Sequence, residues 1–174
     1  MIRKIRKIRK INSKKIIILA LFTAVSLVLF VVEMQIPPLS PVPGIKLGLA
    51  NIVTLFILYK KESKPGDAFL VIIARVLLAS LITGNLSALF FSFTGGIAAI
   101  CTMLLFKKIF KAKLIPVTSV AGAISHNVTQ AVVAVLVYNS KGILLYIPVL
   151  IFGGILSGLL TGFTAEIIIK RLRR

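Results

Sequence analysis

Long apolar runs separated by short basic clusters constrain this chain more than any other feature of its sequence. There are six such runs, over residues 16–32, 47–59, 68–83, 86–106, 117–138 and 143–169. A transmembrane helix needs about 20 mostly apolar residues, and most of the runs approach or reach that length. We therefore expect an all-α integral membrane protein, a six-transmembrane-helix bundle whose membrane domain covers residues 16–169.

The composition agrees with this class and excludes several others. Hydrophobic residues make up 58% of the 174 residues and charged residues only 15%, whereas soluble domains carry about 25% charged residues. The net charge of +18 does not indicate nucleic-acid binding, because the basic residues stand at the ends of apolar runs and not on a soluble scaffold. The single cysteine, Cys101, excludes a disulfide framework within the chain and a thiolate metal cluster.

The positions of Lys and Arg predict the topology. The tail 1–15 carries eight, the loops near residues 60–64 and 107–113 carry three and four, and the end 170–174 carries four. The opposite side carries only Lys46 and Lys141. By the positive-inside rule both termini are expected in the cytoplasm, with the chain in the cytoplasmic membrane and its basic ends 1–15 and 170–174 against lipid head groups.

The second apolar run is too short to cross a bilayer. It is expected to begin inside the membrane near Gly44, after a segment with four prolines between Pro37 and Pro43. Prolines at this density exclude a helix and favour an extended chain. On the outer face this segment is either a plain linker or a lid over a cavity.

Polar side chains inside the apolar runs are the candidate site residues, because an unsatisfied polar group in hydrocarbon costs several kcal/mol. Arg75 has no acid in its own run, so it needs an anionic ligand, water or helix-end carbonyls. His126, Asn127 and Gln130 share one helical face by their spacing. That face either forms hydrogen bonds between helices or binds a ligand.

Three further residues are expected on the outer side of the same region. Lys46 and Asn51 flank the start of the second run, and Asn85 follows Gly84 in a short turn. Lys46 is either a boundary anchor or an anion contact beside a helix start. Glu33 is interpreted as an acid solvated at the membrane interface.

Small residues at four-residue spacing predict close helix contacts. Gly154, Gly158 and Gly162 indicate internal packing of the last helix. Ala20 and Ala24 have the same spacing on the first helix, where the pattern alone is weak evidence.

The inventory of side chains argues against an enzyme. Asp67 is the single Asp, so no aspartate-rich metal–diphosphate site is available, and one His without a carboxylate pair argues against a metal site. The chain has no phosphate loop for ATP hydrolysis. We expect no cofactor and no catalytic residue.

The segment Pro43–Ile52 with its sequence PGIKLGLANI, Arg75, and the segment 125–130 with its sequence SHNVTQ resemble the Gx transporter family. This family is also known as heptaprenyl diphosphate synthase component I. It is similar to the S components of energy-coupling factor (ECF) transporters, which have six membrane helices and no ATPase of their own. In those proteins an AxxxA motif on the first helix contacts a transmembrane coupling subunit, and Ala20 and Ala24 fit it.

The resemblance implies a substrate-binding subunit that works with a coupling subunit and two ATPase subunits supplied in trans. Its ligand is expected to be small and anionic or amphipathic, such as an isoprenoid diphosphate, and to contact Lys46, Asn51, Arg75, Asn85, His126, Asn127 and Gln130. Two alternatives stay open. One is a non-catalytic membrane subunit that recruits a prenyl synthase, and the other is a stand-alone secondary transporter, for which His126 is the only group titrating near neutral pH.

Overall fold

The computed structural model describes residues 13–37, 46–110 and 114–172. Its regular elements are α1 (Ser13–Gln35), α2 (Ala50–Tyr59), α3 (Pro65–Thr83), α4 (Leu86–Phe110), α5 (Ile115–Tyr138), the 3-10 helix η1 (Lys141–Tyr146) and α6 (Ile147–Leu172). Five helical segments of this part of the chain are long and apolar enough to cross a membrane, and α2 is shorter. The expected multi-pass, all-helical membrane protein is confirmed, with five spans plus a short helix where six spans were predicted.

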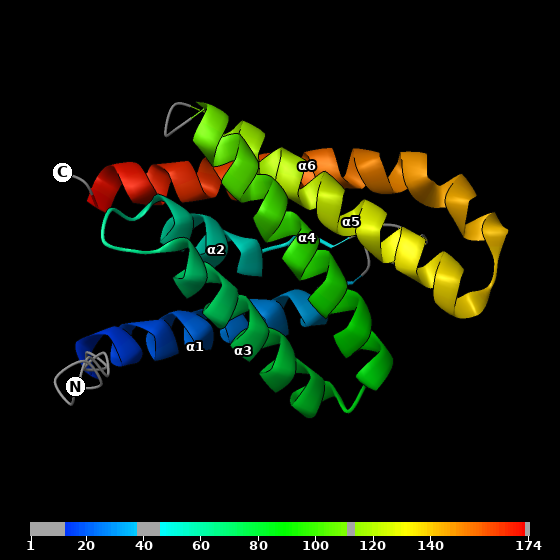
Figure 1. The fold of residues 1–174 in the computed structure, drawn as a ribbon, viewed down its shortest axis with the longest axis horizontal. Helices are drawn as coiled ribbons and strands as arrows, with labels where there is room; N and C mark the ends of the chain where they lie inside the picture. The colour runs from blue at the N-terminus through cyan, green and yellow to red at the C-terminus, as the bar shows by residue number, and fades with distance from the viewer. Residues whose placement is uncertain (1–12, 38–45, 111–113, 173–174) are drawn as a thin grey trace, which may run out of the picture.

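The helices form two groups that meet along the middle of the molecule (Figure 1). In one group α5 packs against both α4 and α6, and in the other α1 packs against α2 and α3. Contacts between α3 and α4 and between α2 and α6 join the two groups. The start of α1 and the end of α6 lie at the same end, and α2 begins about halfway along the bundle. Gly44 and nearly all of the Pro37–Pro43 segment lie outside the described residues.

Glycines bring α5 and α6 into direct backbone contact. An ideal Cβ placed on Gly158 would lie 2.5 Å from the Val120 Cα, and one on Gly162 would lie 2.6 Å from the Pro116 Cα. Gly154 faces the backbone of Ile124 at 3.1 Å in the same way. The prediction that this glycine spacing serves internal packing is confirmed.

Hydrogen bonds between buried side chains reinforce this contact and tie α5 to its other neighbours. The hydroxyls of Ser119 and Thr161 lie 2.9 Å apart across the α5–α6 seam. The Tyr59 hydroxyl lies 2.9 Å from that of Thr118, which links α2 to α5. Such bonds satisfy polar groups that would otherwise be unpaired in an apolar medium.

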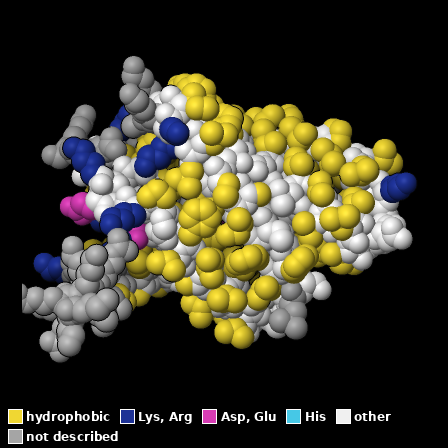
Figure 2. Space-filling model, in the orientation of Figure 1, with side chains coloured by type: hydrophobic (Ala, Val, Ile, Leu, Met, Phe, Trp, Pro, Cys, Tyr) yellow, Lys and Arg dark blue, Asp and Glu magenta, His cyan; other side chains and the backbone are white. Residues whose placement is uncertain are grey.

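Charged and apolar side chains occupy different parts of the surface. Most of the visible Lys and Arg side chains gather at the end where the described chain starts and finishes, a basic side chain also lies at the opposite end, and hydrophobic side chains are spread over the face between (Figure 2). Outward-facing residues such as Leu81, Leu136 and Leu145 are more than three-quarters exposed. Apolar side chains exposed in a broad band are typical of a surface that contacts lipid.

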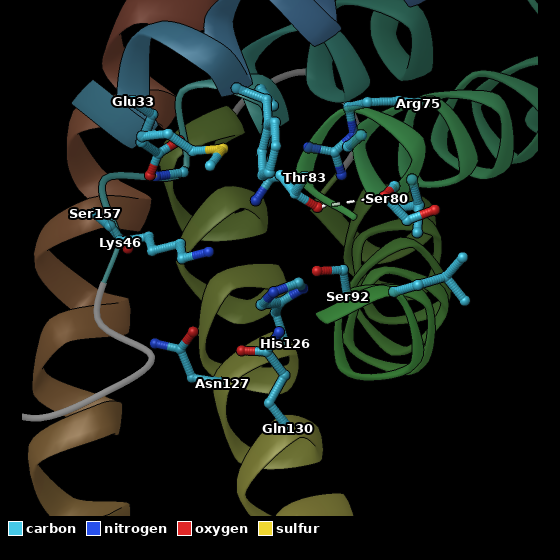
Figure 3. A pocket seen from close by; sticks show the side chains of 18 of the residues that line it. Glu33, Lys46, Arg75, Ser80, Thr83, Ser92, His126, Asn127, Gln130 and Ser157 are labelled. Carbon is cyan, nitrogen blue, oxygen red and sulfur yellow. Dashed lines mark hydrogen bonds between the residues drawn. The ribbon is translucent and has the colours of Figure 1, made fainter. Parts of the chain in front are cut away.

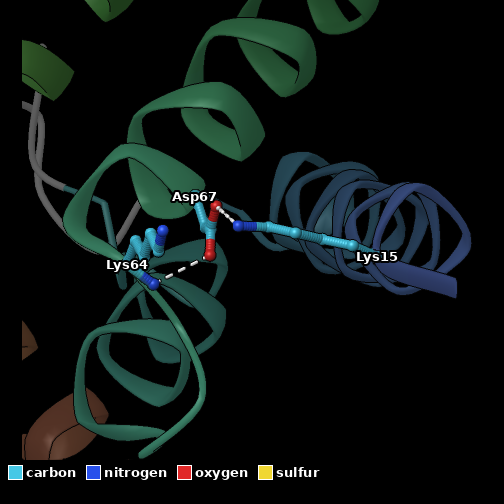
Figure 4. A network of polar contacts seen from close by, with 3 residues as sticks. All are labelled: Lys15, Lys64 and Asp67. Carbon is cyan, nitrogen blue, oxygen red and sulfur yellow. Dashed lines mark hydrogen bonds and ion pairs between the residues drawn. The ribbon is translucent and has the colours of Figure 1, made fainter. Parts of the chain in front are cut away.

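The basic end also contains an acid that joins two helices. Asp67 is buried at the start of α3, where its carboxylate accepts a hydrogen bond from the Lys64 backbone N–H at 2.8 Å. Its other oxygen lies 2.6 Å from the Lys15 Nζ on α1 (Figure 4). Asp67 therefore caps α3 and fixes the start of α1 beside it.

Candidate ligand-binding site

A cavity of about 430 Å³ lies among the helices, with lining residues from α1 to α6. Its volume falls within the range of small-molecule sites, about 300–1,000 Å³. The lining includes all seven residues selected from the sequence, namely Lys46, Asn51, Arg75, Asn85, His126, Asn127 and Gln130. The structure thus brings them together around one space (Figure 3), and their role as ligand contacts stays a prediction.

Arg75 is the buried cation of this cavity. It lies in the middle of α3, and its side chain points toward the space between Lys46 and His126 (Figure 3). Only 8% of the residue is exposed, and its Nε–H has no hydrogen-bond partner among the described residues. A buried, incompletely satisfied guanidinium is expensive without an anion or an acceptor. Arg75 is therefore prepared for an acceptor that the described residues do not supply at Nε.

The polar face of α5 forms hydrogen bonds to neighbouring helices and also lines the cavity. The Asn127 amide donates to the Leu150 carbonyl of α6 at 2.9 Å, and the Gln130 amide donates to the Phe91 carbonyl of α4 at 3.3 Å. These bonds fix α5 between its neighbours. His126 differs, because its buried Nδ1 has no partner among the described residues. A neutral imidazole nitrogen either donates or accepts a hydrogen bond, so His126 can serve a ligand of either kind.

Gly95 of α4 makes room for this face. A Cβ at Gly95 would lie 3.0 Å from the Nδ1 and Cε1 atoms of His126 and 3.0 Å from the Cγ of Gln130. The missing side chain lets the imidazole lie against the α4 backbone. The position of His126 in the cavity thus depends on a residue that sequence analysis did not select.

Glu33 was misinterpreted as an interfacial acid. The structure places it in the cavity lining, near the end of α1, where its two carboxylate oxygens accept hydrogen bonds from the backbone N–H groups of Gly48 and Leu49 at 2.6 and 3.0 Å. Gly48 has a φ of 72°, a conformation that side chains other than glycine rarely adopt. The glycine turn presents these N–H groups to Glu33 just before α2 begins.

Sequence analysis also missed several hydroxyl residues that line the cavity. They are Ser80, Thr83, Ser92 and Ser157. The Ser80 and Ser157 hydroxyls donate to carbonyls three residues earlier in their own helices. Because Ser and Thr commonly bond back to their own helix, their presence in an apolar run gives no signal of a site.

Apolar side chains complete the lining. Phe30, Met34, Val76, Ala79 and Leu89 all border the cavity, and the Lys46 ammonium lies 5.7 Å from the Phe30 ring centroid. The described residues hold no group of three or more His, Cys, Asp or Glu side chains suited to a metal. The cavity is amphipathic, because two cations, one acid and an imidazole line it together with these apolar side chains.

The two alanines expected to contact a partner lie away from the cavity. Ala20 and Ala24 are both exposed on α1, on a face with Leu21 and Val28, which are each 60% exposed. This face is an apolar strip that the described residues leave exposed, and its role in docking stays a prediction.

Comparisons with known proteins agree with this architecture. A family model described as heptaprenyl diphosphate synthase component I matches residues 22–168. The S component of a bacterial ECF transporter has a similar solved structure, with a TM-score of 0.54, 22% sequence identity, and coverage of 92% of this chain and 94% of that chain. A search of the curated proteins found no match.

Proposed function

Because the chain belongs to the heptaprenyl diphosphate synthase component I family and has the fold of an ECF transporter S component, we propose that it is the membrane-embedded, substrate-binding subunit of an ECF-type uptake transporter. The observation that carries the proposal is the cavity around Arg75. The Nε–H of the buried Arg75 guanidinium and the Nδ1 of the His126 imidazole have no hydrogen-bond partner among the described residues, which is a costly arrangement for packing alone and a suitable one for a ligand.

The ligand is small and either anionic or amphipathic. A volume of about 430 Å³ lies in the lower part of the range of small-molecule sites, about 300–1,000 Å³. A complete heptaprenyl chain exceeds this space, whereas a molecule of short isoprenoid size fits. An isoprenoid diphosphate, which the name of the family suggests, is one candidate.

Binding and energy supply are divided between subunits in this proposal. Both ends of the described chain lie at the basic end of the molecule, which the positive-inside rule assigns to the cytoplasm. Arg75 and Lys46 compensate the ligand charge, and Asn51, Asn85, His126, Asn127 and Gln130 supply hydrogen bonds. The exposed Ala20 and Ala24 strip docks onto a transmembrane coupling subunit that two separate ATPase subunits drive.

Affinity purification of the tagged chain from its native membrane tests this function. We expect mass spectrometry to detect a coupling membrane protein and two ATPases, together with a retained small molecule. Ala24→Leu places a bulky side chain on the docking strip and should abolish recovery of the complex. Val132→Phe enlarges an exposed side chain on α5 and serves as the matched control.

Two results would contradict the proposal. Recovery of a prenyl synthase without any ATPase would support a membrane scaffold for prenyl synthesis. Ion-driven uptake by the purified chain alone in liposomes would support a stand-alone secondary transporter.

A further inference from the structure

Three charged side chains line the cavity. Lys46 and Arg75 are its cations, and Glu33 is its acid. The other acids of the chain, Glu62, Asp67 and Glu166, do not line it. The segment 38–45, which lies outside the described residues, contains no charged residue. With His126 in its neutral form, the cavity therefore carries one net positive charge.

Glu33 is a fixed member of this set. Both of its oxygens are held by backbone N–H groups, at 2.6 Å from Gly48 and 3.0 Å from Leu49. If its carboxylate moved away, two backbone donors at the start of α2 would lose their acceptors, which is costly in an apolar environment. An incoming anion therefore meets Glu33 in place and does not displace it.

A membrane-embedded cavity penalises uncompensated charge more strongly than an aqueous cleft. Charges interact several times more strongly at low effective dielectric than in water, and an isolated buried ion is costly. One negative charge on a ligand neutralises the cavity. A diphosphate brings more negative charge than the cations can compensate, and the surplus would lie close to Glu33.

The donor geometry suits an oxyanion head group, and the charge of Glu33 decides which one. The Arg75 Nε–H has no partner among the described residues, and a planar guanidinium pairs with carboxylates and phosphates alike through two parallel hydrogen bonds. Phe30, Met34 and Leu89 line the cavity beside these polar groups. They provide a surface for a compact hydrocarbon body.

We propose that Glu33 determines the ligand's charge, so that the cavity selects a compact amphiphile with a single negative charge, of the carboxylate class, over a diphosphate. The Arg75 guanidinium pairs with the head group, and Glu33 offsets one of the two positive charges that Arg75 and Lys46 bring to the cavity. This inference rests on the proposed function and narrows its ligand. It removes the isoprenoid diphosphate from the candidates while keeping a small branched hydrocarbon as the ligand body.

Titration calorimetry on the purified full chain in mild detergent tests whether the cavity prefers a ligand with a single negative charge. The probes have short branched tails of four or five carbons and different heads, namely isopentenol, isovalerate, isopentenyl phosphate and isopentenyl diphosphate. Chelator in the buffer prevents metal ions from neutralising the phosphates. We expect isovalerate to bind at least about tenfold more tightly than the diphosphate, and Arg75→Ala to remove this binding.

Variants that change the charge of the cavity distinguish an effect of Glu33 on the preferred ligand charge from a purely structural role of this residue. Glu33→Gln gives the cavity two net positive charges and should shift the preference toward the diphosphate by at least about tenfold. The double change Glu33→Gln with Lys46→Gln restores one net charge and should restore the preference for isovalerate. Glu62→Gln removes the same charge from an exposed position outside the cavity and should leave the preference unchanged.

Tighter binding of the diphosphate to the unaltered chain would overturn the inference, and so would the absence of Arg75-dependent binding of isovalerate. A preference that the double variant fails to restore would also overturn it. Each of these results leaves recovery of the ATPase complex unaffected. Failure of the charge preference is therefore distinguishable from failure of the proposed function.

Discussion

The close backbone contact between α5 and α6 predicts that a larger side chain at this contact destabilises the protein. In Gly158→Ala the new Cβ would lie 2.5 Å from the Cα and 2.9 Å from the N of Val120. Carbon atoms in favourable contact are about 3.5–4.0 Å apart. Backbone atoms cannot rotate away as a side chain can, so the two helices must separate by about 1 Å at this point.

The expected cost follows from what this separation disrupts. Overpacking of a tight contact costs typically about 1–3 kcal/mol. The bonds between Ser119 and Thr161 and from Asn127 to Leu150, both 2.9 Å, cross the same seam, and bonds of this kind in membrane bundles average about 0.6 kcal/mol each. The gain in helix propensity from Gly to Ala, about 1 kcal/mol, offsets part of the loss. We expect a net destabilisation of about 1–3 kcal/mol.

Equilibrium unfolding in mixed micelles with increasing denaturing detergent, followed by circular dichroism, measures this change. Gly66→Ala is the matched control, because Gly66 lies in the first turn of α3 and a Cβ there meets nothing within 4 Å. The control should be neutral or more stable by up to about 1 kcal/mol. Gly158→Ala with the stability of the unaltered chain would refute the close packing of α5 and α6.

Three further predictions concern the site and the basic end. Arg75→Lys keeps the charge and loses the planar fork, so ligand affinity in calorimetry should fall by at least about tenfold while circular dichroism stays unchanged; unchanged affinity would contradict direct contact. Gly95→Ala should push His126 away and weaken ligand binding several-fold, with a destabilisation below about 1.5 kcal/mol in the unfolding assay; unchanged binding would show that the imidazole is not a contact. Asp67→Ala should destabilise the chain by about 1 kcal/mol through the lost cap of α3, more than Lys15→Ala, whose half-exposed ammonium adds little; the reverse order would contradict the capping role.

Sequence alone predicted most of the membrane helices and selected polar residues that line the cavity, because both depend on strong local signals. Hydrophobic runs identify membrane helices, since every backbone group must bond within its own segment. Arg75 and His126 stand out because ionisable residues are rare in such runs. Their convergence on one cavity was predicted only because each of them needs a polar or charged partner within the membrane.

Sequence analysis could not predict the role of a residue when that role depends on a contact far along the chain. Glu33 stands near the end of α1, where an acid is normally solvated, and only the fold brings Gly48 and Leu49 to it. Gly95 had no distinguishing spacing, and its role appears only when His126 lies against it. A glycine within an apolar run, or an acid at its edge, has several ordinary structural explanations, so neither indicates a site by itself.

The short helix α2 connects the fold to the charge of the cavity. Its ten residues extend only about 15 Å, half of a hydrocarbon core of about 30 Å, and it begins about halfway along the bundle. A helix that starts inside a membrane leaves backbone N–H groups without partners, and Glu33 accepts two hydrogen bonds from the turn before it. The acid that allows this interrupted span also reduces the positive charge beside Arg75. Replacing it to admit a more highly charged ligand would therefore also weaken the start of α2, so the fold and the ligand charge are constrained by the same carboxylate.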